Sequence, residues 1–224
     1  MRALRAHSLS LFFAAIFALS LLGQSAAGLA VFNDEARAHG NPPIGYLDFI
    51  TSSSFVVDVA ENWQSEFLQF AVFILATIWL VQRGSSESKK QGDEGIGTDA
   101  EQLVGPHARS DSPRWAKAVG WRQVLYSNSL LLVMGVIFAL SWFTQSVAGL
   151  VVFNEDQADH GEPAIGWGAY VASPDFWNRT LQNWQSEFLA VGCMVAFSIY
   201  LRQRGSAESK PVGTPHHTAS VESE

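Results

Sequence analysis

The seven residues NWQSEFL occur at Asn62–Leu68 and again, letter for letter, at Asn183–Leu189, each time at the start of a mostly apolar run. The residues around them match as well. A shift of about 121 positions aligns residues 7–89 with residues 128–210 without a gap, and roughly 40 of about 83 pairs are identical. The sequence therefore predicts two tandem copies of one helical unit.

The composition is typical of a membrane protein. Hydrophobic residues make up 48% of the 224 residues and charged residues only 16%. The apolar residues gather in runs of about twenty, long enough to cross a hydrocarbon core of ~30 Å as helices. The predicted spans are residues 9–32 and 63–81 in the first copy, and 129–153 and 184–201 in the second. The predicted fold is all-α, an integral membrane protein of four transmembrane helices built as a tandem repeat of two two-helix hairpins.

The polar segments between and after these runs lack periodicity. They include GSSESKKQGDEGIGTDAEQ from Gly84 and GSAESKPVGTPHHTASVESE from Gly205. We expect a first membrane repeat at 7–89, a disordered linker at 90–127, a second repeat at 128–210 and a disordered tail at 211–224. The end of the linker, PRWAKAVGWRQVLY from Pro113, combines Trp with basic residues and is typical of an anchor at the cytoplasmic interface.

The N-terminus has the basic start, apolar middle and small residues of a secretory signal. The same pattern recurs internally at residues 129–149, where no signal peptidase would act. We therefore expect the first span to be retained.

The lysine and arginine residues predict the orientation, because flanking loops rich in them stay cytoplasmic. In a four-span arrangement, only Arg37 and Arg179 fall on the outer side. The other side holds Arg2, Arg5, Arg83, Lys89, Lys90, Arg109, Arg114, Lys117, Arg122, Arg202, Arg204 and Lys210. Both termini and the linker are then cytoplasmic, and the two hairpins share one orientation.

The outer loops are acidic. They carry Asp34, Glu35, Asp48, Asp58 and Glu61 in the first copy, and Glu155, Asp156, Asp159, Glu162 and Asp175 in the second. Such a surface attracts cations, although a solvated rim that keeps the loops soluble has the same composition. The net charge of -7 argues against nucleic acid as a partner.

The last helix is expected to begin before the membrane. Ser173 suits the N-cap, Pro174 the first helical position and Asp175 the first turn. Trp63 and Trp184 then mark the outer interface.

Glu66 and Glu187 fall deep in their spans. About 15 residues separate Glu66 from Val81, which places its carboxyl group some 22 Å from the cytoplasmic boundary. A carboxyl group at that depth is costly unless it is paired, protonated or hydrated. Ser20, Gln24 and Gly28 share one helical face, as do Ser141, Gln145 and Gly149, and small or hydrogen-bonding residues of this kind form helix contacts in lipid. We expect Gln24 near Glu66 and Gln145 near Glu187, with Asn62 and Asn183 one turn outward.

Two interpretations of this polar cluster are open. In the first, favoured one, Ser, Gln, Asn and Glu form an interhelical hydrogen-bond network that fixes the helix register. In the second, Glu66 and Glu187 approach each other as a paired carboxylate site for protons or a cation.

Other chemistry is sparse. His39 and His160 occupy matching HG positions in the outer loops and are weak metal candidates, since their spacing is not a recognised metal motif. Cys193 lies mid-span and is expected to be a small core residue. No phosphate-binding loop, H-E-x-x-H or G-x-S-x-G motif is present. No cofactor and no catalytic residue are expected.

The duplicated AGLxVFN, HG and NWQSEFL motifs resemble those of a family of small bacterial membrane proteins classed as a domain of unknown function. The resemblance covers both copies and implies a multi-pass protein of the bacterial inner membrane. We expect a non-enzymatic structural or accessory component, whose partners are the lipid bilayer and either another membrane protein or a second copy. The alternatives are a small proton or cation transporter using the paired glutamates and, third, an outer-face metal enzyme.

Overall fold

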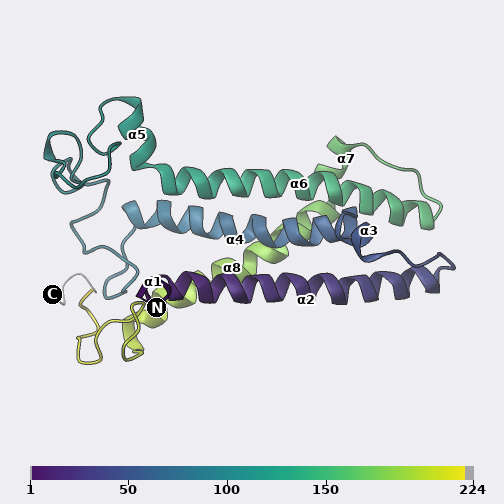
Figure 1. Ribbon diagram of the computed structural model, residues 1–224, viewed down its shortest axis with the longest axis horizontal. Coiled ribbons are helices and arrows are strands. Elements are labelled where there is room, and N and C mark those ends of the chain that lie inside the picture. The colour runs from purple at the N-terminus through teal and green to yellow at the C-terminus, as the bar shows by residue number, and fades with distance from the viewer. Residues whose placement is uncertain (1, 220–224) are drawn as a thin grey trace. The chain divides into compact units, whose positions relative to one another are not determined.

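Helices account for all the regular secondary structure in residues 2–219, the part of the chain that the computed structural model describes. In chain order they are α1 (Arg2–Ala6), α2 (Ser8–Ala38), α3 (Tyr46–Ile50), α4 (Ser53–Trp79), the 3-10 helix η1 (Gly105–His107), α5 (Trp121–Ser127), α6 (Ser129–Asp159), α7 (Trp167–Val171) and α8 (Pro174–Tyr200). Figure 1 traces this order from purple α1 to the yellow tail. The prediction of an all-α fold is confirmed.

Three helices in each half have matching bounds. The helices α6, α7 and α8 begin and end 121 residues after α2, α3 and α4, as Ser129 follows Ser8 and Tyr200 follows Trp79. Each half therefore has a long helix, a short one and a second long one. The short helix between the two long ones was not expected from the sequence.

The chain forms two compact units, and each draws on both halves. One comprises Met1–Ala60 and Thr144–Val171, so it holds α2, α3, α7 and the C-terminal half of α6. The other comprises Glu61–Phe143 and the chain from Ala172 onward, so it holds most of α4, all of α5 and all of α8.

The start of α8 agrees with the sequence prediction. The Ser173 hydroxyl accepts a hydrogen bond from the Phe176 backbone N–H at 3.3 Å, Pro174 is the first helical residue and Asp175 lies in the first turn. In the first half, the Ser52 hydroxyl accepts from the Phe55 N–H in the same way. Both caps satisfy backbone donors that the helix itself leaves unpaired.

Among the described residues, α2 and α6 are the helices long and apolar enough to cross a membrane. Large apolar side chains along α2 are exposed, including Phe13 at 60% and Leu19 at 70%, as expected for a surface that faces lipid. The polar residues of NWQSEFL make α4 and α8 less apolar than α2 and α6. Membrane association thus has support from two helices, and the spans at 63–81 and 184–201 stay predictions.

The segments that follow α4 and α8 form the same turn. The Gln82 N–H donates to the Ser88 hydroxyl at 2.7 Å, and the Gln203 N–H donates to the Ser209 hydroxyl at 2.9 Å. Gly84 and Gly205 supply the left-handed residue, with φ of +85° and +82°. Side chain to backbone bonds of this kind order polar chain without a core, so residues 82–88 and 203–209, near the ends of the two predicted repeats, form matching hydrogen-bonded turns.

The tail is attached to the turn after α4 through Lys210. The Lys210 side chain is buried, and its ammonium donates to the carbonyls of Gly84 at 2.5 Å and Thr218 at 2.9 Å. Linker and tail lie at the C-terminal ends of α4 and α8 (Figure 1).

Candidate functional site

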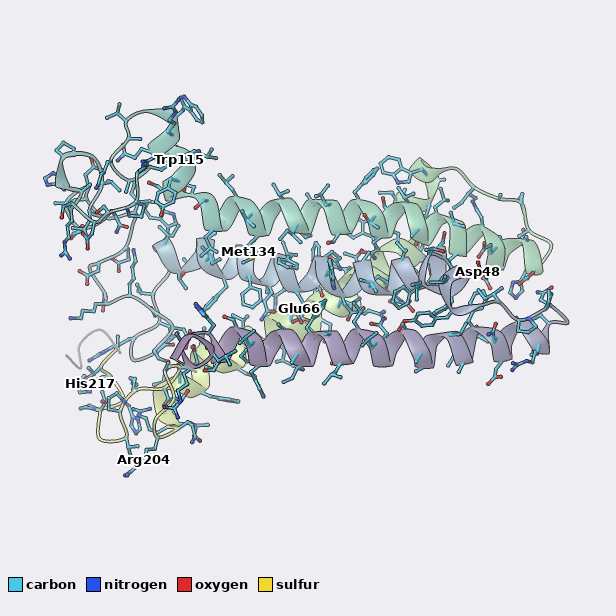
Figure 2. All side chains as sticks on the ribbon, in the orientation of Figure 1. Asp48, Glu66, Trp115, Met134, Arg204 and His217 are labelled. Carbon is cyan, nitrogen blue, oxygen red and sulfur yellow. The ribbon has the colours of Figure 1, made fainter. Side chains whose placement is uncertain are left out.

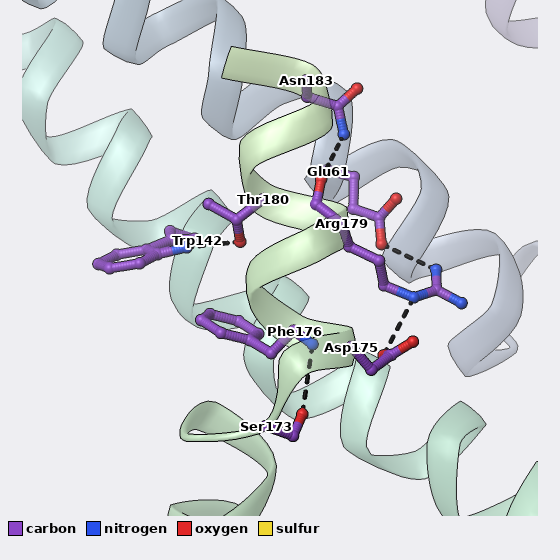
Figure 3. Close-up of polar contacts among 8 residues, drawn as sticks. All are labelled: Glu61, Trp142, Ser173, Asp175, Phe176, Arg179, Thr180 and Asn183. Carbon is purple, nitrogen blue, oxygen red and sulfur yellow. Dashed lines mark hydrogen bonds and ion pairs between the residues drawn. The ribbon is translucent and has the colours of Figure 1, made fainter. Parts of the chain in front are cut away.

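The helices that carry the two NWQSEFL motifs contact each other through an ion pair. The Arg179 guanidinium donates to Glu61 of α4 at 2.9 Å and pairs with Asp175, one turn earlier on α8, at 3.3 Å (Figure 3). The Glu61 side chain is only 10% exposed. The charge of a carboxylate removed from water needs such a cation, so the pair fixes α4 and α8 at this level.

A second polar contact joins the motifs themselves. The Trp184 indole N–H donates to Gln64 Oε1 at 2.8 Å, and Gln64 is completely buried. Within residues 2–219, Gln64 Nε2 has no hydrogen-bond acceptor. At the α4–α8 contact, the oxygen of the Gln64 amide is therefore hydrogen-bonded, whereas its nitrogen is unsatisfied within these residues.

An aromatic group packs beside this contact. The Trp142 indole N–H donates to the Thr180 hydroxyl at 3.3 Å, and its ring stacks on Phe176 with centroids 5.9 Å apart (Figure 3). Thr180 and Phe176 are buried. These contacts attach the first half of α6 to α8.

The two glutamates of the motifs lie near each other. Glu66 is exposed and Glu187 is half-buried, and the Glu66 carboxylate is close enough to repel the charge of Glu187. Neither carboxylate takes part in a hydrogen bond or ion pair with residues 2–219. Figure 2 shows Glu66 part-way along α4, away from the tail residues Arg204 and His217.

The other predicted members of the polar cluster differ between the halves. Ser20 and Gln24 are exposed, whereas Ser141 and Gln145 are buried. Asn62 is exposed, and the half-buried Asn183 donates to the Arg179 carbonyl of its own helix at 2.9 Å. Gln24 and Glu66 belong to different compact units, as do Gln145 and Glu187, so the proposed Gln–Glu pairs stay predictions.

The loop between the two long helices of each half is closed by an asparagine. Asn33 accepts from the Ile44 N–H at 2.7 Å and donates to the Ile44 carbonyl at 3.1 Å, and Asn154 makes the same two bonds to Ile165 at 2.9 and 3.0 Å. A two-bond clamp fixes a loop of about ten residues at both of its ends.

The short helices are seated on α2 and α6 by aromatic residues. Buried Phe49 lies against Gly28, and buried Tyr170 lies against Gly149. Next to them, the Tyr46 hydroxyl is 2.8 Å from the Ser25 hydroxyl, and the Trp167 indole donates to the Ser146 hydroxyl at 3.0 Å. Glycine is required where the aromatic ring approaches the helix backbone this closely.

A family model described as a domain of unknown function, DUF6766, matches residues 1–221. The chain belongs to this family. No curated protein and no solved structure matches it. Membership of DUF6766 confirms the resemblance to an uncharacterised family that the duplicated motifs indicated, and it assigns no activity to any residue.

The two histidines predicted as weak metal candidates in this DUF6766 chain are turned toward its own backbone. His39 Nδ1 is 2.9 Å from the Glu35 carbonyl, and His160 Nδ1 is 2.8 Å from the Asp156 carbonyl. Among the described residues, no three His, Cys, Asp or Glu side chains are grouped as metal ligands. The weak metal prediction for His39 and His160 therefore gains no support.

The sequence prediction missed the residues that make the contacts. Glu61 and Arg179 were assigned only to the acidic or basic loop surface, and Asn33, Asn154 and Gln64 were not singled out. Asn33 and Asn154 fall in the duplicated VFN, and Gln64 falls in NWQSEFL. The presence of the same polar residue in both copies could thus have indicated a structural contact.

Proposed function

We propose that the protein is a tandem-repeat, multi-pass membrane protein in which α2, α4, α6 and α8 all span the bilayer. The matching helix bounds of the two halves support the repeat, since a second long helix returns the chain in each. An even number of spans per half keeps both outer loops on one side and both termini and the linker on the cytoplasmic side.

Within this arrangement the protein acts as a non-enzymatic structural or accessory component through its two outer loops. The observation that carries this role is the asparagine clamp, which recurs at Asn33 and Asn154 although the enclosed sequences differ, as DEARAHGNPP and EDQADHGEPA. Both loops thus keep the same clamped shape and expose acidic side chains. Such a loop suits docking of a partner, because the loop is already ordered before it binds.

A cysteine-accessibility experiment tests the arrangement. In a Cys193→Ser background, single cysteines replace Asn41 and Glu162, which are exposed and equivalent in the two outer loops, or Ile96 in the linker. Four spans place 41 and 162 on one side of the membrane and 96 on the other. If only α2 and α6 cross, positions 41 and 96 react from the same side and position 162 from the opposite one.

The docking role has its own test. A photo-crosslinker at position 41 or 162 should form a specific adduct in cells, and Asn33→Ala with Asn154→Ala should lower the yield by opening both clamps. The same crosslinker at position 96 is the control. Adduct formation that does not depend on the clamps would contradict docking through ordered loops.

A proton or cation site at Glu66 and Glu187 is the second candidate. The observation that favours it is that the Glu66 carboxylate acts electrostatically on Glu187, while neither carboxyl group has a hydrogen bond within residues 2–219. Carboxylates retained at depth without a structural partner are typical of ion and proton pathways.

The double variant Glu66→Gln, Glu187→Gln separates the two candidates. If the glutamates carry ions, the variant abolishes cation- or proton-dependent flux in liposomes and keeps or raises the thermal stability of the purified protein in detergent. A large loss of stability with no flux in the wild type would assign the glutamates to helix packing.

A further inference from the structure

The linker has two halves of opposite charge. Residues 91–108 contain the acidic side chains Asp93, Glu94, Asp99 and Glu101 and no lysine or arginine. Residues 109–126 contain four basic side chains, Arg109, Arg114, Lys117 and Arg122, and a single acidic one, Asp111. A positive segment thus lies directly before α6 in a protein whose net charge is -7.

The positive segment is folded so that its large side chains point outward. Ala116 is buried and its carbonyl accepts from the Gly105 N–H at 2.8 Å, and the Lys117 ammonium donates to the Ser110 carbonyl at 2.6 Å. Around this turn, six side chains are exposed and form what we term the basic-aromatic patch: Arg114, Trp115, Lys117, Val119, Trp121 and Arg122.

Aromatic and cationic groups contact each other within the patch. The rings of Trp115 and Trp121 meet edge to face with centroids 6.4 Å apart, and the Arg122 guanidinium lies 5.5 Å from the centre of the Trp121 ring. Trp121 is 67% exposed and Val119 80% exposed. Exposed apolar side chains that lie together and are bordered by cations mark an interaction surface.

The covalent connection to α6 indicates what covers the patch. α5 ends at Ser127, and α6, which is apolar and long enough to cross a membrane, begins at Ser129. Ser129 is eight positions after Trp121, a rise of about 12 Å if helical. The patch is therefore held within reach of the headgroup layer at the N-terminal end of α6, where tryptophan and basic side chains are both favoured.

We propose that the basic-aromatic patch binds anionic phospholipid headgroups in the leaflet at the N-terminal end of α6. Arg114 and Arg122 match phosphate oxygens with paired N–H donors, Lys117 adds a positive charge, and the two indole rings enter the interface. This binding goes beyond the proposed function and depends on α6 entering the membrane, whatever the number of spans.

Fluorescence of the full-length protein tests the position of the patch. In a Cys193→Ser background, an environment-sensitive probe is attached to cysteine in place of Val119 or, as the control, Ile96, which is 72% exposed in the acidic half of the linker. In phosphatidylcholine vesicles containing phosphatidylglycerol, the probe at 119 should shift to the blue and be quenched by bromolipids. Equal, water-like emission at 119 and 96 would overturn the proposal.

Charge variants test the lipid specificity. Arg114→Gln, Lys117→Gln and Arg122→Gln together should lower phosphatidylglycerol retention in native mass spectrometry, by roughly fivefold for each basic residue removed. The control, Arg5→Gln, Arg83→Gln and Arg204→Gln, removes three exposed basic residues outside the patch. An equal loss in both variants would show general attraction to the membrane and overturn the assignment to the patch.

Discussion

Arg179 illustrates how one side chain can hold two helices. Its guanidinium pairs with Asp175 on its own helix and with Glu61 on α4, and the Glu61 side chain is only 10% exposed. We expect Arg179→Ala to lower the free energy of unfolding by about 1–3 kcal/mol, because Glu61 keeps its charge in a buried position. Thermal unfolding in detergent measures the loss.

An exposed ion pair provides the control. Arg37 and Asp34 are 2.6 Å apart, but their side chains are 59% and 76% exposed. Arg37→Ala should change stability by less than about 0.5 kcal/mol, since water screens the pair. Equal effects of the two substitutions would show that the burial of Glu61 has no energetic weight.

Gly149 tests the close approach of Tyr170 to α6. An added Cβ would overlap the Tyr170 hydroxyl and lie 3.1 Å from Cζ, and the ring is completely buried. Gly149→Ala should therefore destabilise by about 1–3 kcal/mol.

Gly135 is the matched position on the same helix. A Cβ there meets nothing within 4 Å, so Gly135→Ala should be neutral or stabilise by up to about 1 kcal/mol. Detergent unfolding curves compare the two variants. A stabilising Gly149→Ala would contradict the seating of Tyr170 on α6.

His160 responds to pH through Asp156. The hydrogen bond to the Asp156 carbonyl and then the charge of the Asp156 carboxylate raise the pKa of His160 above its ordinary 6.5. A raised folded-state pKa gives stability that is complete below the unfolded pKa and is lost as pH rises through the folded one. NMR titration should show a lower pKa of His160 in Asp156→Asn, and a smaller decrease in Asp159→Asn.

At the scale of the element, α4 and α8 depend on the indole of Trp184. Trp184→Phe keeps a ring but removes the donor to Gln64, which is completely buried. We expect a loss of about 1–3 kcal/mol. Trp177→Phe is the control, since Trp177 is 38% exposed and packs through its ring. A loss in Trp177→Phe as large as in Trp184→Phe would assign the effect to packing.

The short helices show what an element needs beyond its own sequence. Tyr46–Ile50 and Trp167–Val171 have five residues each, too few to form a helix alone. The asparagine clamp sets their start, and Phe49 and Tyr170 attach them to the preceding long helix. The sequence pattern predicted a loop at both places, because the contacts that stabilise these helices are tertiary.

At the scale of the whole molecule, the two halves in sequence are not the two compact units. Each unit contains chain from before and after the linker. We therefore expect residues 1–120 or 121–224 expressed alone to be degraded, whereas co-expression should restore a folded, co-purifying pair. Size-exclusion chromatography in detergent measures assembly. A stable, monodisperse 1–120 fragment would contradict this interdependence.

The sequence by itself determined the helical class, the two aligned halves and the N-cap of α8 at Ser173, because apolar runs, duplication and N-caps are local signals. The tertiary structure decided which polar residues meet. Glu61 and Arg179 are 118 residues apart and Gln64 and Trp184 are 120 apart. It also ordered the turns after α4 and α8 and joined Lys210 to Gly84. Such contacts depend on how segments distant in sequence pack together, and the spacing of residues along the chain does not reveal that packing.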